Sequence, residues 1–254
     1  MEKLKLGMIG GGDGSFIGAI HRNAAYLDNC YELVCGSFSR NFNNSLETGK
    51  KLFLNPNRIY KSYEDMIDQE SKLDSSIRMD VVSIVTPNHV HFDPAFKALN
   101  KGFPVIIDKP MTYDSNEALK LVKVVNETGL PFAVTHTYTG YPMVKEAKQL
   151  IHSGKIGKLR KVAVEYPQGW LTTNLESTKN KQASWRTDPK KSGIAGSMGD
   201  IGTHAANMVE YVTGKKIIKL FSKVNTVVDG RKLEDDGRSE EQTSELQSPV
   251  TISY

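Results

Sequence analysis

The chain has 254 residues, of which 39% are hydrophobic and 24% are charged, and its formal net charge is +4 at pH 7. This composition is typical of a globular protein with one large domain or two ordinary ones. Lysine and arginine are scattered among acidic residues, the two cysteines are too few for a disulfide framework, and no apolar run is long enough for a signal peptide or a membrane span. We therefore expect a cytoplasmic protein that binds neither nucleic acid nor membranes.

The first half of the chain alternates strand-like and helix-like segments. Short, continuous apolar runs predict strands at 5–9, 33–37, 81–85, 105–107 and 132–134. Helical spacing predicts helices at 16–27, 62–67, 94–100 and 116–128. Strands buried on both faces and separated by helices form a parallel sheet. Residues 1–134 are therefore predicted to be an α/β domain with a doubly wound parallel sheet.

The second half, residues 135–237, has a different pattern. Helices are predicted over 143–153 and from residue 196 to residue 211, and alternating strands over 159–166 and 217–227. A polar loop is predicted over 168–193. This pattern favours an α+β domain with an antiparallel sheet, but it supplies too few strands to complete one.

The last segment reads RSEEQTSELQSPVTISY and has no pattern that continues the sheet. It resembles the translation of a common sequencing adapter, which encodes the same residues over 238–248 apart from a histidine at position 242. We therefore expect residues 238–254 to be a non-native tail, with a natural polar tail as the alternative. A gene recloned from its source is expected to have a stop codon or an unrelated continuation after Gly237.

A glycine-rich stretch, GGGDGSFIG at residues 10–18, lies directly between the first predicted strand and the first predicted helix. A dinucleotide-binding fold needs glycines there, because the backbone turns sharply and approaches a pyrophosphate at the helix N-terminus. The spacing is looser than G-x-G-x-x-G, and a merely flexible loop is the alternative. The residues predicted to contact a cofactor here are Gly10, Gly12, Gly14, Ser15, Phe16 and Ile17.

The stretch after the second predicted strand, GSFSRN at residues 36–41, lacks the acidic residue that often binds the adenosine ribose. Ser39 and Arg40 are candidates to bind a 2′-phosphate instead, because arginine supplies charge-assisted donors where an aspartate would repel. A solvated Arg40 is the alternative. The cofactor is therefore predicted to be NAD or NADP.

The run GSMGDIGTHAANM, residues 196–208, places Asp200 and His204 four residues apart among small residues. On a helix this spacing puts both side chains on one face. An imidazole that titrates near neutral pH is a candidate general base, and a structural surface pair is the alternative. No cluster of cysteines and histidines with zinc-site spacing accompanies the pair, so no metal is predicted.

Four stretches together resemble the Gfo/Idh/MocA oxidoreductases. They are the glycine loop, SIVTPNHVHFDPAFKALNKG at 83–102, IIDKP at 106–110 and GDIGTHAANMVEYVTG at 199–214. The resemblance covers residues 1–236 and implies an N-terminal Rossmann domain followed by an open-faced antiparallel sheet that often serves for oligomerisation. Similar proteins continue beyond the point where this chain ends, so the resemblance also implies that the second domain is incomplete, which puts the activity of this chain in doubt. At full length, the resemblance implies a homo-oligomer.

The resemblance also implies roles for residues of the first domain. Asp108, Lys109 and Pro110 match the family's Glu-Lys-Pro, with aspartate in place of glutamate. Lys109 is expected to bind the reacting hydroxyl and help place the nicotinamide, since an ammonium group stabilises a developing alkoxide. Asp108 is expected to lie at the cofactor, and a cis peptide is expected before Pro110.

A second set of residues near the nicotinamide is implied by the match to Thr-Pro-Asn after a strand. It consists of Thr86, Pro87 and Asn88, and ordinary turn chemistry is the alternative. His91 is interpreted as structural, and neither it nor His89 is expected to be catalytic.

In the second domain, the resemblance implies that His204 removes the alcohol proton and that Asp200 binds a neighbouring hydroxyl and orients His204. Trp185 and Arg186 lie on a loop that is expected to cover the substrate, with anchoring of the loop itself as the alternative. We therefore expect an NAD(P)-dependent oxidoreductase that acts on a secondary alcohol or ketone of a sugar, sugar derivative or cyclitol. The alternatives are a non-catalytic dinucleotide sensor or repressor on the same fold and a reductase of a non-sugar substrate.

Overall fold

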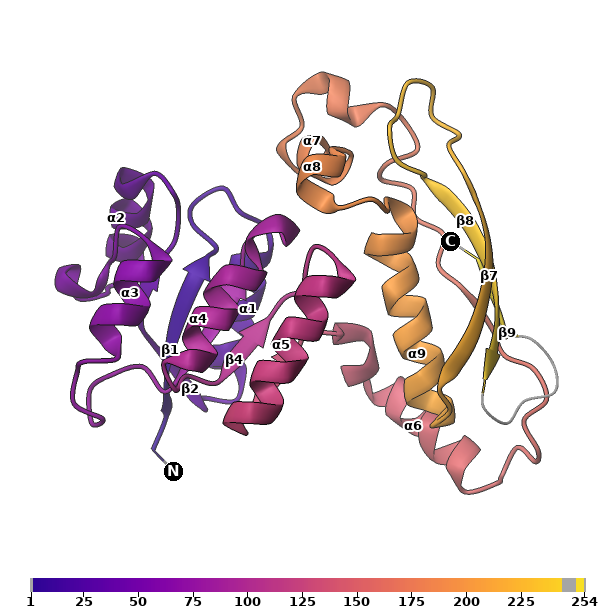
Figure 1. The fold of residues 1–254 in the computed structure, drawn as a ribbon, viewed down its shortest axis with the longest axis horizontal. Helices are drawn as coiled ribbons and strands as arrows, with labels where there is room; N and C mark the ends of the chain where they lie inside the picture. Colours follow the sequence, from indigo (N-terminus) through magenta and orange to yellow (C-terminus); the bar gives the residue numbers. More distant parts are fainter. Residues whose placement is uncertain (1, 244–249, 254) are drawn as a thin grey trace. The chain divides into compact units, whose positions relative to one another are not determined.

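The computed structural model of the chain describes residues 2–243 and 250–253, with side chains described up to residue 241. It divides into two compact units, Met1–Thr135 and His136–Tyr254 (Figure 1). Each unit has its own β-sheet.

The first unit is built on a five-stranded parallel sheet, as predicted. The strand order is β2-β1-β3-β4-β5, so the direction of winding reverses between β1 and β3. In such sheets, ligands bind outside the carboxyl ends of the strands at the point of reversal. The strands are β1 (Leu4–Gly10), β2 (Tyr31–Ser37), β3 (Val81–Val85), β4 (Val105–Ile107) and β5 (Phe132–Val134).

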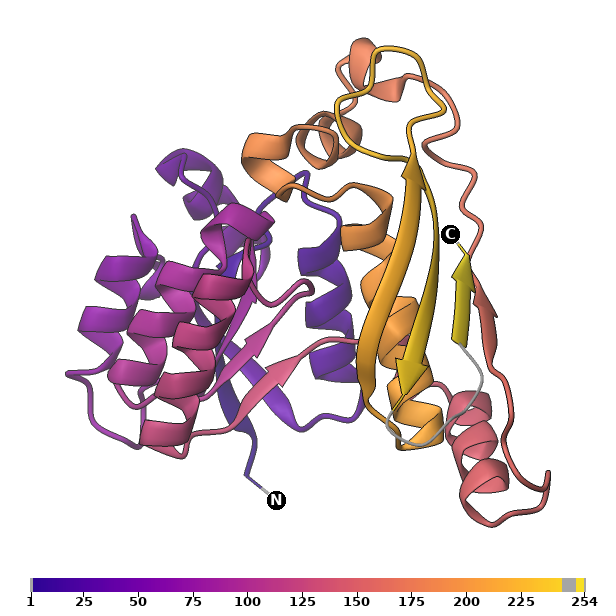
Figure 2. The same ribbon diagram turned by 45° about the vertical axis from the view of Figure 1, so that its right-hand side comes forward.

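Helices cover both faces of this sheet, with α3, α4 and α5 on one face and α1 on the other (Figure 2). Alternate residues of β3 divide between the two layers: Val82 and Ile84 join one buried cluster, and Val81 and Val85 join the other. The helical elements are α1 (Ile17–Leu27), α2 (Phe42–Lys51), η1 (Pro56–Arg58), α3 (Tyr63–Glu70), η2 (Asn88–Val90), α4 (Phe92–Asn100) and α5 (Ser115–Thr128).

Helix α2 was not predicted, because Phe42 and Leu46 are the only large apolar residues in its sequence FNNSLETGKK. It begins at Asn41, whose side chain accepts hydrogen bonds from the amides of Asn43 and Asn44. Its buried residues are the small side chains Ser45, Thr48 and Gly49. A polar cap and small packing residues therefore specify this helix.

The second unit combines a four-stranded sheet with several helices. Strands β7 and β8 and strands β8 and β9 pair antiparallel, whereas β6 and β9 pair parallel. The order is β6-β9-β8-β7, and α9 packs against β6 through Ala205 and Val209. The elements are η3 (Thr137–Gly140), α6 (Pro142–His152), β6 (Ala163–Glu165), η4 (Leu175–Thr178), α7 (Lys181–Arg186), α8 (Pro189–Ser192), η5 (Met198–Gly202), α9 (Thr203–Thr213), β7 (Ile217–Asn225), β8 (Asp236–Thr243) and β9 (Val250–Ser253).

The segment predicted as a polar loop, 168–193, contains the short helices η4, α7 and α8. Each begins at a residue whose side chain accepts a hydrogen bond from a nearby amide: Asn174, Asn180 and Asp188. Such caps stabilise one or two turns without any apolar periodicity. The prediction of a polar loop over 168–193 was therefore wrong in missing these three short helices.

The sheet also continues into the segment that was expected to lie outside the fold. Residues 236–243 form β8, which pairs with β7, and residues 250–253 form β9. Pairing along a strand edge uses backbone groups, so it does not require an apolar sequence. Residues 244–249 and 254 lie outside the described residues, and the non-native origin of 238–254 stays a prediction.

Strand β8 alternates between buried and exposed residues, and its buried side is polar. Gly237, Ser239 and Glu241 are buried, whereas Arg238 and Glu240 are exposed. Glu241 is 2% exposed, and its Oε2 has no hydrogen-bond partner among the described residues. A buried acceptor without a partner costs free energy of folding.

We expect Glu241→Leu to raise the free energy of unfolding in urea by about 1–2 kcal/mol. The exposed Glu240→Leu is the matched control and should leave the unfolding midpoint unchanged. Because burial raises the pKa of Glu241, ionisation destabilises the folded chain, so the gain should be larger at pH 7 than at pH 4. Equal effects of the two variants would contradict burial of Glu241.

A buried carboxylate in the first unit accepts hydrogen bonds from three other residues. Glu70 at the end of α3 is fully buried and accepts hydrogen bonds from Arg58 Nε at 3.0 Å and Nη2 at 2.7 Å, Tyr60 Oη at 2.8 Å and the Met79 amide at 2.8 Å. Burial alone would raise the pKa of Glu70, but the bonds from Arg58, Met79 and Tyr60 outweigh it and lower the pKa.

Glu70→Gln should lower the free energy of unfolding at pH 7 by about 2–4 kcal/mol, since it leaves the Arg58 charge poorly paired. Because the folded-state pKa of Glu70 is lowered, its contribution is present above about pH 4.3, the usual pKa of an unfolded glutamate, and is lost as the pH falls. Urea titrations at pH 7 and pH 3 measure both effects. Glu47→Gln, in an exposed pair with Lys50, is the control and should change neither titration.

Candidate cofactor and substrate sites

The residues predicted to bind a cofactor all follow the carboxyl ends of parallel strands in the first unit. The glycine loop follows β1, Ser39 and Arg40 follow β2, residues 86–88 follow β3, and Asp108 and Lys109 follow β4. Adjacent strands end in register, since Gly10 pairs with Val85 and Ile84 with Ile107. The structure therefore brings these residues to one edge of the sheet, at the point where the strand order reverses.

The glycine loop has a conformation that requires glycine. Gly10, Gly11 and Gly14 have φ angles of 84°, 75° and 76°. A Cβ on Gly18 would lie 2.3 Å from Cα of Gly11, so α1 can approach the loop only because both residues are glycines. Gly11 was not among the predicted residues, although it belongs to the same run of three glycines.

The loop also offers groups that fit a pyrophosphate. Ser15 Oγ is buried and has no hydrogen-bond partner among the described residues, and no described side chain caps the first turn of α1. Arg22, which was not predicted, donates from Nη1 to the Gly11 carbonyl at 2.8 Å and so fixes the loop. Amides at a helix N-terminus together with an available hydroxyl suit an anionic group.

Helix α2 supports the turn after β2. Ser45 Oγ accepts hydrogen bonds from the amides of Phe38 and Ser39, both at 2.9 Å, and Ser39 Oγ accepts from the Asn41 amide at 3.2 Å. Arg40 in this turn is exposed. The turn is thus fixed by its hydrogen bonds, while the Arg40 side chain is accessible to a ligand.

Two histidines hold the segments that follow β3 and β4. Asp108 Oδ1 accepts from Thr135 Oγ1 at 2.9 Å and lies 3.9 Å from His21 Nε2. Burial alone would raise the pKa of Asp108, but the interactions with His21 and Thr135 outweigh it and lower the pKa. The Lys109–Pro110 peptide is cis, and the Pro110 carbonyl lies 2.7 Å from His91 Nδ1.

In the second unit, Asp200 lies in the π-helical turn η5 and His204 in the first turn of α9. One regular helix was predicted here, without the π-helical turn. The turn is held by Glu234, whose Oε1 accepts from the amides of Gly196 and Met198 at 2.7 and 3.1 Å. Two such bonds from a distant residue fix the entry to α9 in a way that no local pattern indicates.

Aromatic residues surround His204, which is 8% exposed. The rings of Tyr138 and His136 lie edge to face with the imidazole, with centroids at 4.6 and 6.0 Å. The hydroxyl of Tyr138 is hydrogen-bonded to that of Tyr166. Burial and this bond raise the pKa of Tyr138. None of the three residues around His204 was predicted: His136, Tyr138 and Tyr166.

Asp200 is paired with a stacked arginine. Arg186 Nε lies 3.6 Å from Asp200 Oδ2, and Arg186 Nη1 donates to Gln182 Oε1 at 2.6 Å. Its Cζ lies 4.2 Å from the ring centroid of Trp185 and 5.6 Å from that of Trp170. The structure therefore places Arg186 beside Asp200 and places the rings of Trp185 and Trp170, the latter not predicted, on the Arg186 guanidinium.

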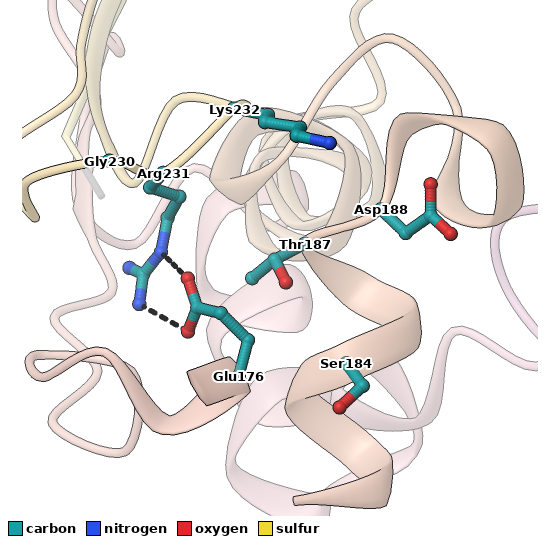
Figure 3. A pocket seen from close by; sticks show the side chains of 7 residues that line it. All are labelled: Glu176, Ser184, Thr187, Asp188, Gly230, Arg231 and Lys232. Atoms are coloured by element: carbon teal, nitrogen blue, oxygen red, sulfur yellow. Dashed lines mark hydrogen bonds and ion pairs between the residues drawn. The ribbon is translucent and has the colours of Figure 1, made fainter. Parts of the chain in front are cut away.

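An open polar pocket of about 290 Å³ lies elsewhere in the second unit (Figure 3). Arg231 donates there to both carboxylate oxygens of Glu176, at 2.8 and 3.1 Å, and also to Asp235 and to the carbonyls of Leu171 and Thr173. These bonds occupy all the Arg231 donors, so we interpret this group as structural. The lining residues are Glu176, Ser184, Thr187, Asp188, Gly230, Arg231 and Lys232.

Two further properties concern the described residues as a whole. No group of three or more histidine, cysteine, aspartate or glutamate side chains in 2–241 is arranged to hold a metal ion. None of the described helices has both the length and the apolar character needed to cross a membrane.

Solved and curated proteins resemble the chain over most of its length. It is 31% identical over 219 residues to the uncharacterized oxidoreductase YfiI of Bacillus subtilis (strain 168), covering 86% of the chain and 55% of that protein. It is 32% identical over 148 residues to levoglucosan dehydrogenase of Pseudarthrobacter phenanthrenivorans, covering 58% of the chain and 35% of the enzyme. The crystal structure of an inositol dehydrogenase homolog from Azotobacter vinelandii, complexed with NAD⁺, matches with a TM-score of 0.94 and 29% sequence identity. The match covers 99% of the present chain and 64% of the homolog's chain.

The chain thus spans about half or less of the length of these curated relatives. Two family models match it in order. The one described as "Oxidoreductase family, NAD-binding Rossmann fold" matches residues 4–136, and the one described as "GFO/IDH/MocA C-terminal domain" matches residues 144–240. The chain therefore belongs to the GFO/IDH/MocA family of oxidoreductases, and its first unit is an NAD-binding Rossmann domain.

Proposed function

We propose that the protein transfers a hydride between the nicotinamide of NAD or NADP and a secondary alcohol or ketone of a sugar, sugar derivative or cyclitol. The observation that carries this proposal is that Asp200 lies in η5 and His204 follows one turn later in α9, with Arg186 Nε 3.6 Å from Asp200 Oδ2 and two tryptophan rings on the arginine. A buried imidazole one turn from a carboxylate suits proton removal, and tryptophan rings suit contact with sugar rings. Two relatives are named for levoglucosan and inositol, which are polyhydroxylated rings.

In this proposal the first unit holds the cofactor. The glycine loop and Ser15 bind the pyrophosphate, Ser39 and Arg40 face the adenosine ribose, and residues 86–88 with Asp108 lie toward the nicotinamide. The support is that all follow the carboxyl ends of neighbouring parallel strands, with Ser15 Oγ available to a ligand. When bound, the nicotinamide supplies the hydride chemistry.

The side chains manage the proton and the developing charge. His204 accepts the proton of the substrate hydroxyl while the carbon that bears this hydroxyl loses a hydride to the cofactor, so that the alcohol becomes a ketone. Asp200 binds a neighbouring hydroxyl and orients His204, and the Lys109 ammonium stabilises the alkoxide as it develops. Trp185 and Arg186 bind the substrate ring, with Trp170 as a further contact.

We expect His204→Ala and Lys109→Met each to lower kcat/KM by about 10³-fold while NAD⁺ binding to His204→Ala is retained. Turnover is measured as the absorbance of reduced nicotinamide, using protein expressed from the recloned gene and a panel of sugars and cyclitols. His152→Ala, an exposed histidine at the end of α6, is the matched control and should be unaffected. Unchanged turnover in His204→Ala would refute its role as base, and tight NAD⁺ binding without turnover of any substrate would favour a sensor.

We also propose that Arg40 allows NADP to bind. Arg40→Ala should weaken NADP⁺ binding about tenfold and NAD⁺ binding less than about twofold, since a charge-assisted hydrogen bond contributes about 1.5 kcal/mol. Calorimetric titration with each cofactor measures the two dissociation constants. Lys50→Ala removes an exposed cation of the neighbouring helix α2 and serves as the control. Equal weakening of both cofactors in Arg40→Ala would exclude a 2′-phosphate contact.

A further inference from the structure

His91 lies buried between the ends of two neighbouring strands. It is 1% exposed, with Nδ1 2.7 Å from the Pro110 carbonyl oxygen and Nε2 2.8 Å from the Thr86 carbonyl oxygen. Thr86 follows β3 and Pro110 follows β4, so one ring joins the two segments that carry the proposed nicotinamide contacts. A neutral imidazole carries one N–H, so His91 donates a hydrogen bond to one of the two carbonyls and its other ring nitrogen packs against the second; a phenylalanine would fill a similar volume but would donate to neither.

A second histidine supports the same segment from another direction. His21 of α1 lies with Nδ1 3.0 Å from Ser83 Oγ on β3 and Nε2 3.9 Å from Asp108 Oδ1. The same carboxylate oxygen accepts from Thr135 Oγ1, just after β5. Asp108 is thereby connected to the end of β5 and, through His21, to α1 and β3.

Serine, histidine and aspartate in this order are also the residue types of a hydrolase triad. Ser83, however, is 2% exposed and lies in the middle of β3, a strand buried along its whole length. A nucleophile must be reached by its substrate. The three residues therefore form a support for the end of β4 and not a nucleophilic centre.

Lys109 lies between the two supported residues. The side chain of Asp108 is held on its N-terminal side, and the carbonyl of Pro110 is held on its C-terminal side. A lysine side chain has many rotamers, so its ammonium reaches a defined point only if the backbone that carries it is fixed. A displacement of about 1 Å in a reacting group can lower a rate about 100-fold.

We propose that His21 and His91 are positioning residues that fix the backbone on either side of Lys109. This inference rests on the role proposed above for Lys109. It assigns neither histidine a contact with substrate. Their effect on turnover is therefore exerted through Lys109, and it should disappear when the Lys109 ammonium is absent.

A double-mutant cycle tests this dependence. His91→Phe should lower kcat about 10- to 100-fold in the wild-type background and less than about twofold in the Lys109→Met background. A merely structural role would lower kcat equally in both backgrounds, and that result would overturn the proposal. His89→Phe, an exposed histidine two residues away, is the matched control. His21→Gln carries the same cycle if His91→Phe does not fold.

Hydrogen–deuterium exchange provides a readout that does not depend on activity. Amides of residues 105–112 should exchange at least about tenfold faster in His91→Phe than in the wild type, while amides of β1 and of α9 are unchanged. Unchanged exchange over 105–112 would overturn the positioning role whatever the activity. Full turnover by Lys109→Met would instead refute the proposed function of Lys109, so the two failures are distinguishable.

Discussion

The first unit depends on the close approach of α1 to the end of β1. This approach leaves no room for a side chain at Gly18, where a Cβ would lie 2.3 Å from Cα of Gly11. Because β1 is flanked by β2 and β3 in parallel, the same contact sets α1 at the edge where three neighbouring strands end. The helix amides, the loop and the residues after β3 and β4 then converge on one region, which is where a dinucleotide is bound in folds of this kind.

The parts of the fold that could be predicted are those with a local apolar pattern. Strands such as β3, whose five residues are all buried, have bounds that agree with the sequence prediction. Helix α2 and the helices within 168–193 were missed because asparagine and aspartate caps define them. Strand β8 was missed because its buried positions include Ser239 and Glu241, and no amphipathic pattern marks such a strand. This strand forms through backbone pairing with β7 and β9, which is independent of side-chain type.

The site shows the same division between local and distant information. Some features of the site are local patterns and could be predicted from the sequence. They are the glycines after a strand and the acidic residue four positions before a histidine. The supports around them are not local: Arg22 holds the Gly11 carbonyl, Glu234 holds the turn before α9, and Tyr138 packs on His204. Contacts between residues far apart in the chain leave no spacing to detect, and only the folded structure reveals them.

In the function we propose, the protein moves a hydride from a carbinol carbon to nicotinamide while His204 takes the proton. Deuterium transfer measures this directly. Protein expressed from the recloned gene is incubated with NAD⁺ or NADP⁺ and cyclitols or sugars deuterated at their carbinol carbons, and the reduced cofactor is examined by NMR. We expect deuterium at C4 of the nicotinamide with the wild type and almost none with His204→Ala. Reduced cofactor without deuterium at C4, or equal incorporation by both proteins, would contradict it.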